Sequence, residues 1–224
     1  MTQLPLEFGF PPSFAAADFL VSACNQNAFA WVEHWPHWNG PALAVCGPPG
    51  CGKTHLAHVW QARAGAAFIE AQRLPGVDLA RLLPASGACV VDAIATAGFD
   101  AEGERALLHL YNMIVERRGY LMLCAEMPPA RWTLRLPDLR SRVLAAPVVT
   151  VEPPDDGLLE SLLAKLFADR QLTVDRGTII YIVTRMERSF DAARRLVDAI
   201  DRAALAQQRR PSLALVREVL ERAA

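Results

Sequence analysis

The residues best suited to chemistry stand together in one short stretch, "GPPGCGKT", which begins at Gly47 and ends at Thr54. A glycine, four further residues and then Gly-Lys-Thr is the pattern of a phosphate-binding loop. In such a loop the Lys53 ammonium bridges the β- and γ-phosphates, and the Thr54 hydroxyl holds Mg²⁺. The backbone N–H groups that can point at phosphates are those of Gly50, Cys51, Gly52, Lys53 and Thr54. The pattern predicts a nucleotide site, with an ordinary glycine-rich turn as the alternative.

Asp92 is the expected second ligand of the magnesium ion. It ends the apolar run "ACVVD", and P-loop enzymes that hydrolyse nucleotides place an aspartate at the tip of a neighbouring strand. The next residue is Ala93, where many ATPases have an acid that activates water. The two positions together favour nucleotide binding over efficient hydrolysis. A helix cap is the alternative role for Asp92.

Five short apolar runs, separated by helical patterns, must position these residues. The runs are residues 42–46, 66–70, 88–92, 120–125 and 147–152. The glycine-rich loop follows the first run and precedes a helix expected over residues 53–64, as a phosphate loop requires. Strands that are apolar throughout and alternate with helices predict a parallel sheet covered on both faces, which is an α/β fold.

The pattern becomes entirely helical beyond Pro153 and Pro154. Residues 155–171 place leucines on one helical stripe, and Asp155 or Asp156 can cap that helix. Three further helical stretches follow to the end of the sequence. We therefore expect an N-terminal extension over residues 1–12, a nucleotide-binding α/β domain over residues 13–153, and a small helical subdomain over residues 154–224.

Composition narrows the class of protein. The 224 residues are 52% hydrophobic and the formal net charge is -1, so the chain is expected to be globular, and no overall basic field argues for nucleic-acid binding. The five cysteines lack metal-ligand spacing, which indicates buried thiols in a reducing compartment. Neither a signal peptide nor a membrane-spanning apolar run is present, so a cytoplasmic location without membrane contact is expected.

The first residues, "QLPLEF", form an alternating strip ahead of any element that can pack them. In an extended conformation Leu4, Leu6 and Phe8 point to one side. Such a strip is built to be buried against another surface.

The phosphate loop, the "VVD" run, the "PDLRSRV" stretch at residues 137–143 and the closing helices together resemble an AAA+ ATPase of the DnaA group. Within that group the chain is similar to the Hda family, the DnaA-related regulators that inactivate the replication initiator. The resemblance spans nearly the whole chain. It implies an AAA+ P-loop fold with a helical lid, ADP or ATP as ligand with Mg²⁺, and an adenine site near Phe19 and Leu20.

The resemblance also implies partners. The segment that begins at Gln3 and contains Leu4, Leu6 and Phe8 resembles the motif that docks into the apolar pocket of the DNA polymerase sliding clamp; an edge strand is the alternative. DNA is then reached indirectly, through the clamp. Arg142 matches the arginine finger offered to a nucleotide on a neighbouring subunit, here DnaA. Arg140 is the neighbouring candidate, and a surface salt bridge is the alternative for either arginine.

Three departures from the family pattern weaken the expected hydrolysis. The polar sensor near the end of the fourth strand is Ala125 here, the lid arginine corresponds to Asp191, and Ala93 lacks the catalytic acid. The arginines that can substitute in the lid are Arg188, Arg194 and Arg195. Lost transition-state contacts reduce rate more than affinity, so we expect adequate binding of a nucleoside diphosphate and poor hydrolysis of ATP.

The leading hypothesis is a regulator that stimulates hydrolysis of DnaA-bound ATP in trans. A free-standing P-loop ATPase or kinase is one alternative, although no acid follows Asp92. A helicase-loader-like protein that binds DNA is another, but acids interleave with the arginines of the last helices, which usually indicates a solvated face. Head-to-tail oligomers and a homodimer joined by strand addition both stay open.

Overall fold

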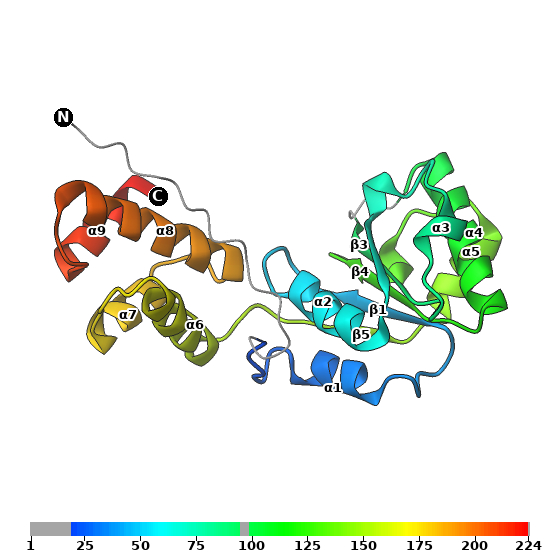
Figure 1. Ribbon diagram of the computed structural model, residues 1–224, viewed down its shortest axis with the longest axis horizontal. Helices are drawn as coiled ribbons and strands as arrows, with labels where there is room; N and C mark the ends of the chain where they lie inside the picture. The colour runs from blue at the N-terminus through cyan, green and yellow to red at the C-terminus, as the bar shows by residue number, and fades with distance from the viewer. Residues whose placement is uncertain (1–18, 95–98, 224) are drawn as a thin grey trace.

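A five-stranded sheet forms the centre of the larger lobe (Figure 1). The computed structural model describes residues 19–94 and 99–223. The strands are β1 (Ala42–Cys46), β2 (Ala67–Glu70), β3 (Cys89–Ile94), β4 (Leu121–Ala125) and β5 (Val148–Thr150). Every neighbouring pair is parallel, and the order is β2-β3-β4-β1-β5. The carboxyl ends of all strands therefore lie at one edge, which is the edge where ligands bind in open α/β sheets.

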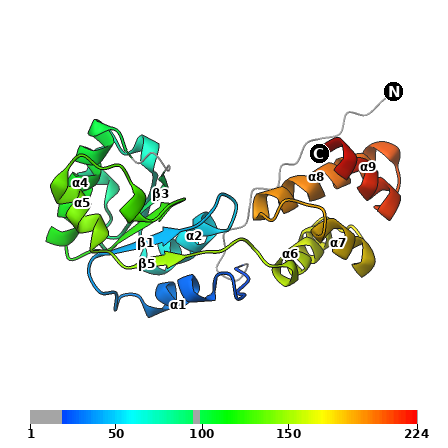
Figure 2. The ribbon, with the colours of Figure 1, turned by 180° about the vertical axis from the view of Figure 1, so that it is seen from behind.

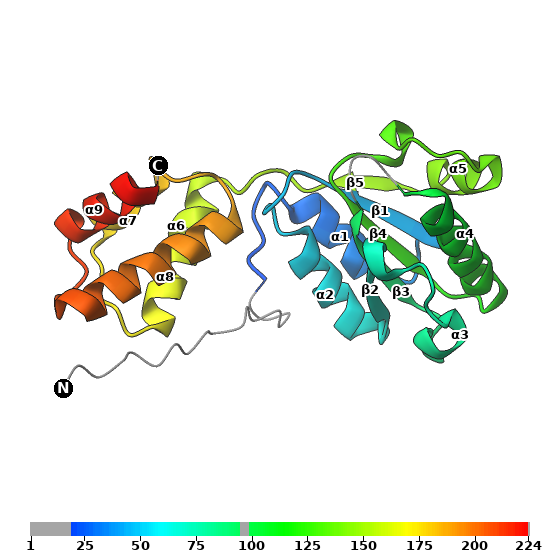
Figure 3. The same cartoon turned by 90° about the horizontal axis from the view of Figure 1, so that it is seen from above.

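Helices cover both faces of the sheet, as the continuous apolar runs predict (Figure 3). One face packs against α1 (Gln26–His34) and α2 (Lys53–Ala64), with Trp60 fully buried between them and the strands. The other face packs against α3 (Leu79–Leu82), α4 (Ala101–Glu116) and α5 (Pro137–Leu144). Two short 3₁₀ turns, Ala71–Arg73 and Pro129–Arg131, complete this lobe. The expected α/β fold is confirmed.

Four helices form a second lobe, which follows β5 (Figure 2). They are α6 (Asp156–Asp169), α7 (Arg176–Val183), α8 (Phe190–Gln207) and α9 (Leu213–Ala223). The side chains of Asp155, Asp175 and Ser189 accept hydrogen bonds from backbone N–H groups in the first turns of α6, α7 and α8. The leucine stripe of α6 packs with Phe167 and Ile200 in a separate core. We call this lobe the lid.

The end of α8 nearest the sheet meets the loop between β1 and α2 (Figures 1 and 2). There the Phe190 N–H donates to the Gly50 carbonyl over 2.8 Å. In the described part of the chain no helix is both long and apolar enough to cross a membrane. The strip of Gln3, Leu4, Leu6 and Phe8, and the extension over residues 1–12, lie outside the described residues.

Candidate nucleotide-binding site

The phosphate loop stands at the carboxyl end of β1 and leads directly into α2. Its Gly50 and Gly52 have φ values of +69° and +102°, a backbone region that L side chains rarely adopt. A Cβ on Gly47 would lie 2.2 Å from the carbonyl oxygen of Val151, so only glycine fits against the chain after β5. Gly50 and Gly52 are therefore required by their backbone conformation, and Gly47 is required by the close approach of the Val151 carbonyl.

Several backbone donors of the loop are uncommitted. The first N–H groups of a helix have no partner within the helix, and at α2 these belong to Lys53 and Thr54. In the described part of the chain their N–H groups and that of Gly52 make no backbone hydrogen bond, whereas Cys51 N–H donates weakly to Pro48 carbonyl over 3.4 Å. The helix dipole adds partial positive charge here. This arrangement fits a phosphate.

The three charged or hydroxyl side chains of the proposed site converge on the loop. The Lys53 ammonium donates to the carbonyl oxygens of Gly47 and Pro48, each over 2.8 Å. The Thr54 hydroxyl donates to the Asp92 carboxylate over 2.8 Å, across 38 positions of sequence. Hydroxyl and carboxylate oxygens are ligands that Mg²⁺ prefers, and few protein ligands are typical of its nucleotide sites. The donor set fits a magnesium nucleotide.

Asp92 is buried two residues before the end of β3, and the strand is irregular immediately after it. Ala93 has φ +56°, and the pairing of β3 with β4 shifts register between Val91 and Ile94. The bulge turns Ala93 to solvent, which keeps the Asp92 carboxylate pointing at Thr54. Sequence reasoning identified the missing acid at position 93 but not this left-handed conformation.

Phe19 lies beside the helix that follows the loop. Its ring stacks on Phe29 with centroids 5.4 Å apart and meets the His55 imidazole edge-on at 5.2 Å. The carbonyl of Leu20 accepts a hydrogen bond from the Asn25 amide. Both residues are half-buried. The segment expected to contact a base is thus held next to the first turn of α2.

Sequence reasoning missed the contact between lid and phosphate loop. A Cβ on Gly50 would lie 2.6 Å from the Ser189 Cβ, and one on Gly52 would lie 3.1 Å from the Phe190 ring. Ser189 also caps α8 by accepting a hydrogen bond from Ala192 N–H. The absence of side chains at Gly50 and Gly52 therefore lets the lid approach the loop closely. The residues that make this contact, Ser189 and Phe190, stand directly before Asp191 in the sequence. Nothing in the neighbouring sequence indicates that they contact the phosphate loop.

The lid places an acid, not a cation, next to these contacts. Asp191 lies in the first turn of α8. The candidate lid arginines are held in ion pairs within the lid, namely Arg188 with Asp156, Arg194 with Asp191 and Arg195 with Glu187. Ala125 is buried at the end of β4, where its carbonyl accepts the Gly47 N–H. Ala93 and Ala125 thus contribute no polar side chain, and Asp191 contributes a carboxylate that is paired with Arg194.

Buried thiols surround the loop. Burial raises the pKa of Cys46 to about 11 and, with the Lys53 ammonium opposing, raises the pKa of Cys51. The pKa of Cys124 on β4 is raised well above its usual value, again by burial. All five cysteines are free and buried, as expected. The raised pKa values keep the thiols of Cys46, Cys51 and Cys124 protonated and poorly nucleophilic at neutral pH.

Arg142 lies far from the loop in the topology of the domain. It is in the last turn of α5, on the sheet face opposite α2. Its guanidinium stacks over Tyr111 at 5.2 Å, in the half of α4 that approaches the amino edge of the sheet. Because the phosphate loop is at the carboxyl edge, Arg142 is not placed to reach it. Arg140 is exposed two residues earlier.

Glu104 anchors the start of α5, and sequence reasoning missed it. Its carboxylate is fully buried and accepts the backbone N–H of Arg135, at 3.0 Å from each oxygen, and that of Leu136 at 2.8 Å. Glu104 and Tyr111 lie seven residues apart on one face of α4. The helix α4 thus holds both ends of the segment that carries Arg142.

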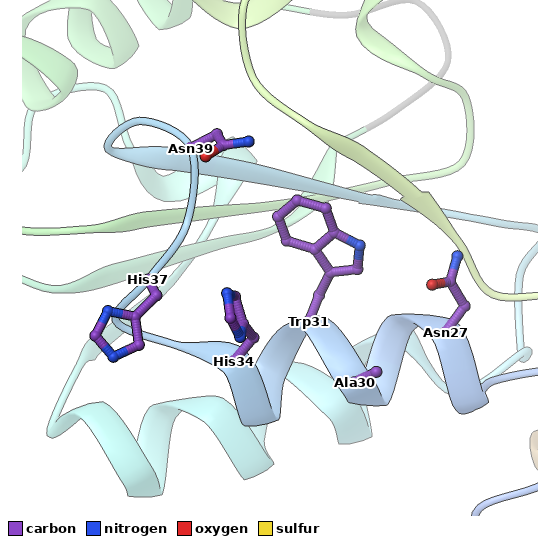
Figure 4. Close-up of a pocket in the computed structure, with 6 residues that line it drawn as sticks. All are labelled: Asn27, Ala30, Trp31, His34, His37 and Asn39. Atoms are coloured by element: carbon purple, nitrogen blue, oxygen red, sulfur yellow. The ribbon is translucent and has the colours of Figure 1, made fainter.

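A shallow cavity of about 370 Å³ lies beside α1, apart from the phosphate loop (Figure 4). Its lining residues are Asn27, Ala30, Trp31, His34, His37 and Asn39. The His34 and His37 rings are 5.7 Å apart. Within residues 19–94 and 99–223, no three His, Cys, Asp or Glu side chains are grouped to hold a metal ion. None of these lining residues belongs to the candidate nucleotide site at the loop.

Comparison with solved structures places the fold. No protein-family model matches the chain. The structure is similar to domain III of the replication initiation protein DnaA from Thermotoga maritima, with a TM-score of 0.79, 14% identity, and coverage of 95% of this chain and 98% of that one. It is also similar to DnaA bound to AMPPCP and single-stranded DNA (TM-score 0.70, 14% identity, 88% and 69% covered). The structure is similar, too, to the RuvB Holliday junction branch migration motor of Thermotoga maritima. For that comparison the TM-score is 0.63 and the identity 17%, with coverage of 81% of this chain and 61% of that one. The chain has the AAA+ fold that these proteins share.

Proposed function

We propose that this chain is an Hda-like regulator of replication initiation that binds an adenine nucleotide and acts on ATP held by DnaA. The observation that carries the proposal is the placement of two groups on one AAA+ domain. A phosphate loop with its lysine, hydroxyl and carboxylate stands at one edge of the sheet, and Arg142 is displayed away from it. One site serves the chain itself, and the other serves a neighbour.

The chain's own nucleotide is held by the loop and its neighbours. Backbone donors of Gly52, Lys53 and Thr54 bind phosphate, the Lys53 ammonium adds charge, and Thr54 with Asp92 holds Mg²⁺. When bound, the magnesium ion neutralises phosphate charge. The similarity to DnaA bound to AMPPCP supports this ligand class.

ADP is the ligand that the site favours. At the lid position a γ-phosphate would meet the Asp191 carboxylate, which pairs with Arg194, and Ala93 and Ala125 provide neither a base nor a polar sensor. The binding of the α- and β-phosphates depends on the loop, which is complete. Loss of groups that act on the γ-phosphate lowers the rate of hydrolysis more than the affinity for nucleotide.

Arg142 supplies charge to the partner's nucleotide. A guanidinium neutralises the charge that develops on a transferring phosphoryl group. Tyr111 holds the guanidinium by stacking on it, and Glu104 fixes the start of the same helix. Such preorganisation lowers the cost of ordering a long side chain at the moment of reaction.

The clamp brings the two proteins together in this proposal. The strip that begins at Gln3 supplies Leu4, Leu6 and Phe8 for an apolar pocket, and it precedes the nucleotide domain. Its resemblance to a clamp-docking motif is the support. A pull-down with purified sliding clamp tests it, because a chain lacking residues 1–8 should be recovered at background level. Equal recovery of the two chains would remove the clamp from the account.

The test of the function uses DnaA loaded with ATP, DNA-loaded clamp and added variants of this chain. Arg142→Ala should reduce the stimulated hydrolysis by at least about a hundredfold, since an arginine finger is worth about 10³–10⁵ in other systems. Arg140→Ala, which removes an exposed arginine one half-turn away, is the matched control. Unchanged stimulation by Arg142→Ala would refute the proposal. Intrinsic turnover of this chain above about one per second would instead favour a free-standing ATPase or kinase.

A further inference from the structure

The arginines of the lid fall into two groups. Acids alternate with these arginines in the sequence, which predicts that the two neutralise one another. The arginines of the first group do form ion pairs with acids of the lid. Its ion pairs are Arg170–Asp198, Arg176–Glu160, Arg188–Asp156, Arg194–Asp191 and Arg195–Glu187. For Arg185 and Arg217, by contrast, no carboxylate of the described residues comes within ion-pairing distance.

Arg185 and Arg217 share one aromatic ring. The guanidinium carbon of Arg185 lies 3.8 Å from the centroid of the Tyr181 ring, and that of Arg217 lies 5.3 Å from it. Tyr181 and Arg185 come from α7 and its carboxyl-terminal turn, whereas Arg217 comes from α9. Both arginines are exposed, and Tyr181 is half-buried. We call these three residues the Tyr181 cluster.

In the described part of the chain, the acids around this cluster form no ion pair with Arg185 or Arg217. On α9 the neighbouring Glu218 instead accepts a hydrogen bond from the Gln207 amide over 3.5 Å. Arg185 donates to the Thr184 hydroxyl over 2.9 Å and to the Tyr181 carbonyl over 3.5 Å, both neutral acceptors. The ring quadrupole attracts each cation, but the two like charges repel one another. An anion that contacts both guanidiniums would relieve that repulsion.

We propose that the Tyr181 cluster is a contact site for the phosphodiester backbone of duplex DNA. The guanidinium is planar and offers a fork of donors that matches phosphate oxygens. The segment that leads into α9 carries Arg209 and Arg210, both exposed and also outside the ion pairs of the described residues. A phosphodiester backbone presents anions at regular intervals, which suits several separate arginines. The Tyr181 ring is already occupied by guanidiniums, so the contact reads charge and not base sequence.

This site goes beyond the proposed function, in which DNA is reached only through the clamp. It also differs from the phosphate loop in position. The helices α7 and α9 pack together in the lid core, whereas the loop contacts the start of α8. A direct contact with DNA would hold the chain in a defined orientation beside a DNA-loaded clamp.

The test measures binding of the full chain to a short fluorescent DNA duplex across salt concentrations. The double variant Arg185→Gln with Arg217→Gln should reduce the log-log salt slope by about 1.8, since each phosphate contact contributes about 0.9. Its affinity at about 0.1 M salt should fall by about tenfold or more. Arg185→Gln alone should give about half the change in slope, which separates a local contact from misfolding of the double variant.

The matched control is Arg176→Gln with Arg195→Gln. It removes the same net charge from the lid, but both of its arginines have carboxylate partners. Its slope should change much less than that of the test variant. Equal slopes for test variant and control would overturn the proposal, as would failure of the intact chain to bind duplex DNA at low salt. If the test variant instead lost recovery by purified clamp with an unchanged DNA slope, the cluster would be a protein contact and the proposal wrong.

Discussion

Replacement of Glu104 tests how the segment carrying Arg142 is held. Glu104 is fully buried on α4, and its carboxylate receives the backbone N–H groups of Arg135 and Leu136 over 2.8–3.0 Å. Glu104→Ala would leave both donors without this acceptor and would open a cavity. We therefore expect loss of stability and a poorly fixed α5.

The size of the effect follows from these contacts. A hydrogen bond to a charged group contributes about 1.5–3 kcal/mol, so removing the acceptor of two N–H donors should lower the unfolding free energy by about 3–6 kcal/mol. Glu104→Gln keeps the shape and one carbonyl acceptor and should cost about 1–2 kcal/mol. Glu102→Ala is the control, because Glu102 is exposed two residues earlier on the same helix.

Urea denaturation followed by circular dichroism measures the difference. With a slope of about 2–3 kcal/mol per M, Glu104→Ala should lower the midpoint by about 1–3 M. Nucleotide affinity at the phosphate loop should be unchanged under native conditions, whereas stimulation of DnaA-bound ATP hydrolysis should fall. A midpoint within about 0.3 M of the Glu102→Ala control, a difference below about 1 kcal/mol, would refute the reasoning about this carboxylate.

Three further predictions concern the nucleotide edge of the sheet. Gly50→Ala should weaken ADP binding, measured by calorimetry, by about tenfold or more. Gly50 has φ +69°, and a Cβ added there would lie 2.6 Å from the Ser189 Cβ. Unchanged affinity would contradict the tight contact. Ala93→Gly should raise the unfolding free energy by about 0.5–1 kcal/mol, since glycine accepts the φ of +56° without strain, and a destabilised variant would argue against that conformation. Burial raises the pKa of Cys46 to about 11 and that of Cys89 to about 12, so the folded state favours the protonated thiols. The contribution of these two thiols to the free energy of unfolding is therefore complete below the pKa of the unfolded state and is lost as pH rises through the folded-state values. The melting temperature should therefore fall above about pH 9, and less steeply in Cys89→Ala; equal slopes would contradict the assignment.

The parts that sequence predicted are those whose physical cause is local. Parallel strands buried on both faces produce continuous apolar runs, so β1 and β4 were visible as runs. The phosphate loop is a contiguous motif, and α2 begins at Lys53 as its pattern requires. The Asp92 carboxylate could be assigned because strand ends meet at one edge of the sheet.

The parts that sequence did not predict depend on distant partners. The donors to Glu104 lie more than thirty positions away along the chain, and a buried carboxylate on a helix gives no local signal of them. The pairing of Tyr111 with Arg142, and of Ser189 with Gly50, likewise joins separate elements. Interleaved charges indicated neutralised arginines, but the fold decides which ones find an acid.

The central claim is that this chain completes another protein's active site while its own is weak. The direct measurement labels only the ATP bound to DnaA and follows that label in a single turnover, with DNA-loaded clamp and unlabelled ADP on this chain. We expect the intact chain to release labelled phosphate from DnaA, Arg142→Ala not to do so, and the chain alone to hydrolyse added ATP slowly. Release of the label at the same rate with intact chain, Arg142→Ala or neither would contradict it.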